Sequence, residues 1–308
     1  MIRMKRLLDC TASDFEKMTG RELKQSILAS EGRTIVAEVI GAVTPYYPAV
    51  TNAEMAAAFG ADLILLNFFD VFNPSMEGLT EVVPDTIVRT LKKIVGRPIG
   101  LNLEPVDVEA DRVETLIELP EGRLATEKSL EKAKELGFDF VCLTGNPKTG
   151  VSNAEITKAI KMARKVFGED GLIISGKMHS AGVAGEVGGS LMSTETLHGF
   201  IEAGADIILI PSPGTVPGFT VEKTAKLVDI VHEKGAMAIL TTGTSQEGAD
   251  EATIKQIALN SKMAGADLFH IGDAGAAGMA IPENIAAYSV VVRGKRHTYV
   301  RMASSILR

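Results

Sequence analysis

The stretch Gly-Ala-Asp-Leu-Phe-His-Ile-Gly-Asp-Ala-Gly-Ala-Ala-Gly-Met, residues 265 to 279, holds the pattern that recurs through the whole chain. A short apolar run follows the triplet Gly265-Ala266-Asp267 and stops at small and polar residues. A strand that is buried on both faces of a parallel sheet has this pattern. We therefore predict a parallel strand that begins directly after Asp267.

Three further copies of the triplet precede apolar runs elsewhere in the chain. They are Gly60-Ala61-Asp62, Gly137-Phe138-Asp139 and Gly204-Ala205-Asp206. Each interval between successive aspartates is long enough for two strand–helix units, so four more strands are expected between the marked ones. The eight strands are expected at residues 34–40, 63–69, 98–104, 140–144, 172–177, 207–210, 236–242 and directly after 267.

Helical patterns separate these eight runs. They cover residues 52–59, 84–95, 126–136, 152–167, 194–203, 221–234, 251–264 and 282–292. Strict alternation repeated eight times predicts an α/β fold, the (β/α)8 TIM barrel. We expect a single domain over residues 1–308, with an N-terminal helical extension over 1–32, the barrel over 33–292 and a C-terminal extension over 293–308. The capping-box sequence Thr19-Gly20-Arg21-Glu22 begins an extra helix, which is expected to cover the N-terminal mouth of the barrel.

Charge and composition disfavour several classes of protein. The net charge of −7 over 308 residues disfavours nonspecific binding to nucleic acid. The apolar runs are too short to span a membrane and the first residues lack a signal sequence, so we expect a cytoplasmic protein without membrane contact. Two cysteines, Cys10 and Cys142, imply no disulfide framework.

The C-terminal region is locally basic, which we interpret as a solvated helix end or a subunit contact in a homo-oligomer. Its basic residues are Arg293, Lys295, Arg296, His297, Arg301 and Arg308.

Polar side chains near the C-terminal ends of the first three strands are candidate site residues, because that face of a TIM barrel carries the active site. Glu38 is expected to point into the barrel, as a catalytic or ligand-binding carboxylate or as the structural partner of an interior lysine. Asn102 and Glu104 share one face of the third strand. Asn67 and Asp70 follow the second strand, and Asn67 is equally well interpreted as a core amide that ties strands together.

The fifth strand carries the sharpest chemical signal. A period of two places Ile173, Ser175, Lys177 and His179 on one face, so that Lys177 and His179 are expected to project together into the site. Lys177 is then an imine-forming nucleophile or a fixed cation. The alternative is that it only partners a buried glutamate. His270 is expected to face the interior below the rim as a core histidine.

The loops after the later strands favour a bound ligand. Thr144 begins a small-residue loop after the fourth strand, and Ser212 lies in a proline-rich loop after the sixth; both are predicted to contact substrate. Glycine-rich loops after the seventh and eighth strands are predicted to hold a phosphate through backbone N–H groups, although Asp273 would repel it. The phosphate-binding residues are expected to be Gly243, Thr244, Ser245, Gly272, Ala274 and Gly275. The acidic connection over residues 105–123 is a candidate lid.

No metal or other cofactor is predicted. Possible oxygen and nitrogen ligands for Mg²⁺ or Mn²⁺ are present, but they show no tight spacing, and Lys177 nearby would repel a cation. These candidate ligands are Glu38, Asp70, Glu104, Asp273 and His179.

The layout from the seventh to the eighth strand resembles the phosphate-binding superfamily of (β/α)8 barrels, which includes aldolases, epimerases and isomerases of small phosphorylated metabolites. The opening residues 5–15 and the run 60–67 look like a little-characterised bacterial family of barrel proteins, some of them labelled haloacid dehalogenase-like hydrolases. In the nucleophile motif behind that label a second aspartate follows Asp9 by two residues, and here Thr11 takes its place.

Three functional hypotheses follow. The first is an enzyme acting on a small phosphorylated carbonyl compound, of the aldolase and lyase or isomerase and epimerase type, in which Lys177 forms an imine and His179 or Glu104 moves a proton. The second is a barrel that binds a phosphorylated metabolite without catalysis. The third is a phosphate-ester hydrolase that uses Asp9.

Overall fold

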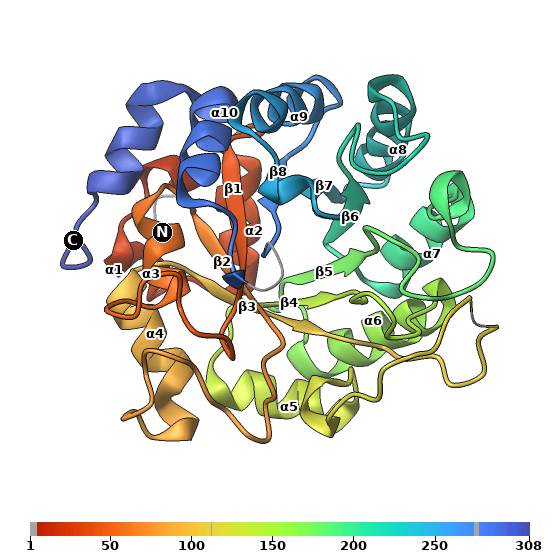
Figure 1. Cartoon of the computed structure of the whole chain (residues 1–308), viewed down its shortest axis with the longest axis horizontal. Coiled ribbons are helices and arrows are strands. Elements are labelled where there is room, and N and C mark those ends of the chain that lie inside the picture. Colours follow the sequence, from red (N-terminus) through yellow and green to blue (C-terminus); the bar gives the residue numbers. More distant parts are fainter. Residues whose placement is uncertain (1–4, 112, 274–276) are drawn as a thin grey trace.

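The computed structural model describes residues 5–111, 113–273 and 277–308, and it confirms the predicted (β/α)8 TIM barrel (Figure 1). Eight parallel strands close on themselves in chain order, β1 pairing with both β2 and β8. The strands are β1 (Thr34–Ile40), β2 (Leu63–Asn67), β3 (Ile99–Leu103), β4 (Phe140–Leu143), β5 (Ile173–Gly176), β6 (Ile207–Pro211), β7 (Met237–Thr242) and β8 (Leu268–Ile271).

The predicted helices form the outer layer. They are α3 (Asn52–Ala58), α4 (Ile87–Val95), α5 (Glu127–Leu136), α6 (Asn153–Phe167), α7 (Thr194–Ala203), α8 (Val221–Glu233), α9 (Glu251–Met263) and α10 (Pro282–Ala303). The last is longer than predicted, because the chain continues as helix beyond a break at Gly294, where φ is 75°. The expected boundary between barrel and C-terminal extension therefore falls at a kink inside α10.

The repeated aspartates pin together the N-terminal ends of neighbouring strands. Asp62, at the start of β2, accepts the amide of Ile35 in β1 (2.8 Å) and donates its own amide to the carbonyl of that residue (2.9 Å). The other three aspartates make the same reciprocal pair with the preceding strand, at Ile99, Ile173 and Ala238. The sequence repeat thus corresponds to the same pair of hydrogen bonds, formed four times at the N-terminal end of the barrel.

Each of these aspartates also contacts a basic side chain. Asp139 pairs with Lys92 (2.6 Å), Asp206 with Arg164 (2.7 Å) and Lys24 (2.8 Å), and Asp267 with His232 (2.7 Å). Asp62 is fully buried and pairs with Arg293 (2.5 Å) and Arg301 (2.7 Å), whose side chains are 0% and 2% exposed. The interpretation of the basic C-terminal residues as a solvated helix end is therefore wrong for Arg293 and Arg301, because their charges neutralise a buried carboxylate.

The N-terminal extension closes the lower mouth, as predicted. It contains η1 (Leu7–Asp9), α1 (Ala12–Phe15) and α2 (Gly20–Leu28). Leu7, Leu23 and Ile27 are buried against the inner layer of barrel side chains, among them Val36 and Met237. Over the described residues, this apolar plug fills the N-terminal end of the barrel interior.

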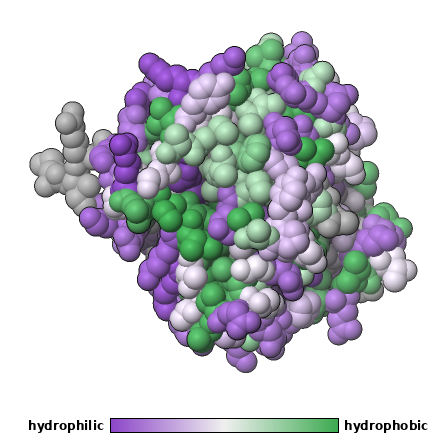
Figure 2. Space-filling view, turned by 60° about the vertical axis from the view of Figure 1, so that its left-hand side comes forward, coloured by the Kyte–Doolittle hydropathy of each residue, from purple (hydrophilic) through white to green (hydrophobic). Residues whose placement is uncertain are grey.

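The side of the molecule that carries both chain ends shows an apolar patch among polar residues (Figure 2). Several large apolar side chains of the C-terminal segment are exposed, namely Tyr299, Val300, Ile306 and Leu307. The homo-oligomer stays a prediction. Among the described residues, no helix combines the length and the apolar character needed to cross a bilayer.

Candidate functional site

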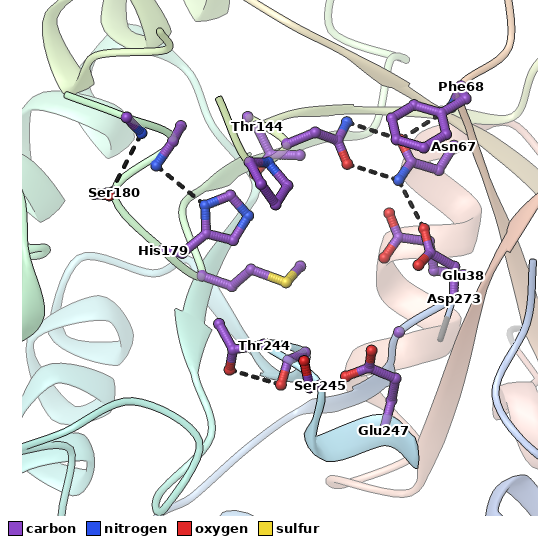
Figure 3. A pocket seen from close by; sticks show the side chains of 18 of the residues that line it. Glu38, Asn67, Phe68, Thr144, His179, Ser180, Thr244, Ser245, Glu247 and Asp273 are labelled. Carbon is purple, nitrogen blue, oxygen red and sulfur yellow. Dashed lines mark hydrogen bonds between the residues drawn. The ribbon is translucent and has the colours of Figure 1, made fainter. Parts of the chain in front are cut away.

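A cavity of about 610 Å³ opens at the C-terminal mouth of the barrel (Figure 3). Its walls come from the ends of β1, β2, β4, β5, β7 and β8 and from Glu114 of the 105–123 connection. Eight of the predicted site residues line it: Glu38, Asn67, Thr144, His179, Gly243, Thr244, Ser245 and Gly272. Five do not, namely Asp70, Asn102, Glu104, Lys177 and Ser212, and Ala274 and Gly275 lie outside the described residues.

Strained backbone gathers around this cavity. Four residues other than glycine that line it have left-handed φ angles: Phe68 (55°), Ala181 (53°), Thr244 (54°) and Ser245 (73°). Such conformations cost of order 1–3 kcal/mol each and persist where the surrounding structure enforces them, often at functional sites. The strain supports a functional role for the cavity.

Glu38 lies at the floor of the cavity between an amide and an imidazole. Asn102 Nδ2 donates to its Oε1, and His270 Nε2 lies 3.2 Å from its Oε2. All three residues are at most 5% exposed. The expected alternative, an interior lysine as the partner of Glu38, is wrong. Asn102 does not reach the cavity and instead holds the carboxylate in place.

A second network ties three loops together at the rim. Asn67 and Asn146 exchange side-chain hydrogen bonds (2.8 and 3.0 Å), and Asn67 Nδ2 also donates to Asp273 Oδ2 (2.9 Å). Asn67 thus does what the core-amide alternative expected and lines the cavity as well. Asn146 was not among the predicted site residues, although it lies two positions after Thr144 in the same small-residue loop.

Glu104 lies behind the loop after β4, not in the cavity. It pairs with Arg123 and accepts the backbone N–H of Asn146 (3.1 Å). Its carboxylate therefore joins the end of the 105–123 connection to the rim. Glu104 is therefore not placed to move a proton in the cavity, as had been predicted.

Lys177 points away from the cavity, so the prediction that it shares a face with His179 inside the site is wrong. Ile174 packs in the barrel interior and Ile173 in the outer layer, which puts residues 173, 175 and 177 on the outer side. The Lys177 ammonium donates to Val151 O (2.6 Å), Ser180 O (3.0 Å) and Glu186 Oε2 (2.6 Å). Burial lowers the pKa of Lys177 and Glu186 opposes that shift, but all three N–H donors are used.

We expect Lys177→Met to destabilise the protein by about 2–3 kcal/mol, since Glu186 and two carbonyls lose their partner and Glu186 is only partly buried. Urea unfolding measures the effect. Lys158→Met removes an exposed lysine of α6 and should change stability by less than about 0.5 kcal/mol. Borohydride reduction with ketones and aldehydes should leave Lys177 unmodified, and an adduct there would restore the imine hypothesis.

Asp70 and Ser212 also have structural positions. Asp70 Oδ1 accepts the amides of Phe72 (2.8 Å) and Asn73 (3.2 Å) and so shapes the turn after β2. Ser212 is fully buried, and its hydroxyl accepts from Thr242 (3.4 Å). Neither residue lines the cavity: Asp70 binds the turn that follows it, and Ser212 binds Thr242 of β7.

His179 is a neutral imidazole at neutral pH. Its Nδ1 accepts the backbone N–H of Ala181 (3.1 Å), so the ring proton is on Nε2, which points into the cavity (Figure 3). Burial, with the nearby charge of Lys177, lowers the pKa of His179 to about 4, although Glu38 opposes the shift. The side chain therefore offers a hydrogen-bond donor without a positive charge.

Glu247 lines the cavity and was missed by the sequence analysis. It lies in η5 (Gln246–Gly248), directly after the strained pair Thr244 and Ser245. The residue is 8% exposed, and burial raises the pKa of its carboxyl. The sequence offered one indication of Glu247, namely that it lies two residues beyond the predicted phosphate-binding residue Ser245.

The 105–123 connection lies across the loops after β4 and β5. Its backbone bonds join Val113 to Gly182 (3.0 Å), Ile117 to Lys148 (2.7 Å) and Asp111 to Ala184 (2.8 Å). With Glu114 in the cavity wall, the segment sits where a lid would, while its movement stays a prediction.

Comparison with known proteins gives a family. Residues 8–308 match the sequence family described as Domain of unknown function (DUF7916). The chain belongs to this family. No curated protein matches it. One solved structure with a similar fold is a thiamine phosphate pyrophosphorylase from Pyrococcus furiosus, 13% identical, with 86% of this chain and 97% of the other covered at a TM-score of 0.48.

The phosphatase hypothesis has no support in this DUF7916 member. Asp9 lies at the plugged end of the barrel, remote from the cavity, where its carboxylate pairs with Arg6 (2.8 Å) and is about half exposed. A nucleophile needs a bound substrate beside it. The label of haloacid dehalogenase-like hydrolase in the resemblance noted above is therefore not supported.

The cavity of this DUF7916 member is acidic. Four carboxylates line it, those of Glu38, Glu114, Glu247 and Asp273, and no lysine or arginine does so among the described residues. Lys148, on the neighbouring loop, pairs with Glu114 (3.7 Å). Within the described part of the chain, no three His, Cys, Asp or Glu side chains are grouped to hold a metal ion. The absence of a metal stays a prediction, but Lys177 is no longer a reason for it.

Proposed function

We propose that the cavity is the active site of an enzyme that transfers a proton within a small carbonyl metabolite, as an isomerase, an epimerase or a lyase. The observation that carries this proposal is a buried carboxylate, Glu38, on one side of the cavity and a neutral imidazole donor, His179, on the other (Figure 3). A base and an electrophile on opposite sides of one substrate are what removal of a proton beside a carbonyl needs.

In this mechanism Glu38 takes a proton from the carbon next to the carbonyl. The C–H electron pair becomes the enolate double bond, and the carbonyl oxygen gains negative charge. His179 Nε2–H donates a hydrogen bond to that oxygen. Glu38 then returns the proton to the neighbouring carbon. The hydrogen bond from Asn102 holds Glu38 in position throughout.

The enzyme hypothesis from the sequence included a phosphate on the substrate, and the geometry of the cavity favours this part less than the proton transfer. Gly243, Thr244, Ser245 and Gly272 do line the cavity, so their N–H groups stand near any ligand. The carboxylates of Glu247 and Asp273 lie on the same two loops and would repel a phosphate. We therefore propose a substrate that does not depend on phosphate at these loops.

The alternative is a barrel that binds the same ligand without chemistry. In that case the ligand binds in the same acidic cavity, but Glu38 and His179 catalyse no reaction. Proton exchange with solvent separates the two functions, because only the enzyme replaces a carbon-bound proton by deuterium.

The test is incubation in D2O with a panel of ketoses, aldoses and amino carbonyl compounds, followed by NMR. We expect deuterium at the carbon next to the carbonyl for at least one compound. His179→Ala should slow that exchange about 10²- to 10³-fold. His179→Gln places a neutral amide donor near Nε2 and should retain most of the rate. Equal losses in the two variants would contradict the role of a neutral donor, and no exchange with any compound would support the binding barrel.

His179 also sets an expectation for pH. Because its pKa is about 4, the imidazole keeps its acceptor Nδ1 and donor Nε2 throughout the neutral range. The exchange rate of the original protein should therefore show no titration of His179 near the ordinary histidine pKa of about 6.5. The pH profile of His179→Gln should match that of the original protein in this range.

A further inference from the structure

Phe68 is an aromatic residue at the rim that the apolar core does not use. It belongs to neither of the two clusters of buried apolar side chains, nor to the partly buried residues packed against them. The next residue, Phe69, is 2% exposed and packs in one of these clusters. Phe68 is half-buried and lines the cavity, with its ring beside Asn67 (Figure 3). Its side chain therefore packs at the site and not in the core.

The backbone conformation that places this ring is strained. Phe68 has a left-handed φ of 55°, which is rare for a bulky side chain. Its N–H donates to Oδ1 of the preceding Asn67 (3.0 Å), and Asn67 is tied to Asn146, so the turn is fixed by hydrogen bonds. A glycine would adopt the same conformation without strain. The turn alone therefore does not require a phenylalanine.

An ion pair holds the ring from the side away from the cavity. The guanidinium carbon of Arg123 lies 4.3 Å from the centre of the Phe68 ring, within the range of a cation–π contact. Arg123 is held in turn by Glu104, which is 1% exposed. Because Phe68 lines the cavity and Arg123 does not, the guanidinium covers the ring on the side away from a ligand.

The surroundings of Phe68 favour an apolar contact. Asn67 uses both N–H groups, toward Asn146 and Asp273, and its oxygen accepts from Asn146 and from the amide of Phe68. All four hydrogen-bonding positions of this amide are therefore occupied. The cavity of about 610 Å³ is also larger than a three-carbon compound needs, since ~150 Å³ is enough to hold benzene.

We propose that Phe68 is a specificity-determining residue that stacks on a ring of the substrate. The proposal rests on the cavity being the active site and names the substrate class for it, a carbonyl compound that carries a flat ring. The carbonyl lies between Glu38 and His179, and the ring packs against Phe68. Aromatic side chains bind flat groups in offset or edge-to-face arrangements, and a ring held from behind is already oriented for that contact.

Three hydroxymethyl ketones test the proposal with the full chain. They share the carbonyl and the hydroxymethyl group and carry a methyl, a cyclohexyl or a phenyl group on the other side. We expect the phenyl ketone to bind at least about tenfold more tightly than the methyl ketone, because it buries more apolar surface. It should bind about threefold more tightly than the cyclohexyl ketone, which is of similar size but is not flat. Ligand-observed NMR gives the dissociation constants.

Variants of Phe68 separate the aromatic ring from its size and from the strained turn. Phe68→Tyr keeps the ring and should keep both preferences. Phe68→Leu keeps an apolar side chain and should lose the preference for phenyl over cyclohexyl. Phe68→Gly fits the left-handed turn and should lose most of the preference for phenyl over methyl as well. Phe72→Leu is the matched control and should bind like the original protein, because Phe72 is 37% exposed and does not line the cavity.

Thermal unfolding checks that all four variants are folded. The proposal is overturned if the phenyl ketone binds no more tightly than the other two, if none of the three binds, or if Phe68→Leu and Phe68→Gly keep the preferences of the original protein.

Failure of this inference differs from failure of the proposed function, because binding and proton exchange are measured separately. Deuterium exchange into the methyl ketone without any preference for the phenyl ketone would remove only the ring from the proposal. A preference that depends on Phe68, without exchange in any compound, would keep the ring site and remove the enzyme.

Discussion

Asp62→Asn should destabilise the protein by about 3–5 kcal/mol, the usual result of breaking a buried ion pair by removing one partner. The asparagine side-chain oxygen can still accept the hydrogen bond from the amide of Ile35, so the substitution measures the effect of the charge alone. Arg293 and Arg301 would remain buried without a carboxylate. Arg97 lies in the same cluster, where burial and the charge of Arg301 lower its pKa to about 10. Equilibrium unfolding in urea measures the loss.

Asp267→Asn is the matched control. Asp267 makes the same backbone contacts at the base of β7 and β8, but its partner His232 is 41% exposed. The loss there should be much smaller, because a solvent-exposed pair contributes little. If the two variants lost equal stability, the shared backbone contact and not the buried charge would be the source.

The effect of Asp62→Asn should depend on pH in one direction. Burial alone would raise the pKa of the Asp62 carboxyl, but Arg293 and Arg301 outweigh burial and hold the pKa below its usual range. The stability from this group is therefore fully present above the unfolded pKa of about 3.9 and is lost as the pH falls through the lower folded value. The difference between the two proteins should be constant near pH 7 and shrink only in acid.

Glu38→Gln should reduce proton exchange by about 10²- to 10⁴-fold, the range typical of a general base. Glutamine can still accept from Asn102, so the floor of the cavity keeps its shape while the basic oxygen is lost. Glu118→Gln, at an exposed residue of the 105–123 connection that does not line the cavity, controls for the change in net charge. Full exchange activity in a folded Glu38→Gln protein would contradict the role of Glu38 and leave Glu247 and Asp273 as candidate bases.

The sequence was enough to predict the barrel. The triplets ending in Asp62, Asp139, Asp206 and Asp267 mark every second strand, and the structure explains why: each aspartate joins its strand to the one before. This information is local, since it depends on a turn, a carboxylate and the next apolar run. The helix over 20–28 was likewise predicted from its capping box, whose two hydrogen bonds both form.

The candidate site could be predicted only in part. Glu38 and His179 were found because a carboxylate or imidazole stands out at the C-terminal end of an apolar strand. Lys177 was misplaced because β5 is apolar on both faces. Ile173 and Ile174 read alike in the sequence, so nothing local tells which of them faces the barrel interior. The strand also ends at Gly176, so the period of two does not continue to His179, which lines the cavity while Lys177 does not.

The sequence by itself therefore determined the number, order and approximate limits of the strands and helices, because those follow from periodicity and turn residues. Only the tertiary structure decided which charges are left to the cavity. Lys177 meets Glu186, Glu104 meets Arg123, and Arg293 and Arg301 meet Asp62, across 9, 19, 231 and 239 residues of chain. These pairings hold Lys177, Arg293 and Arg301 away from the cavity, whose lining among the described residues contains four carboxylates and a neutral His179. The physical reason is that each pairing joins separate segments of the chain, which no local pattern records.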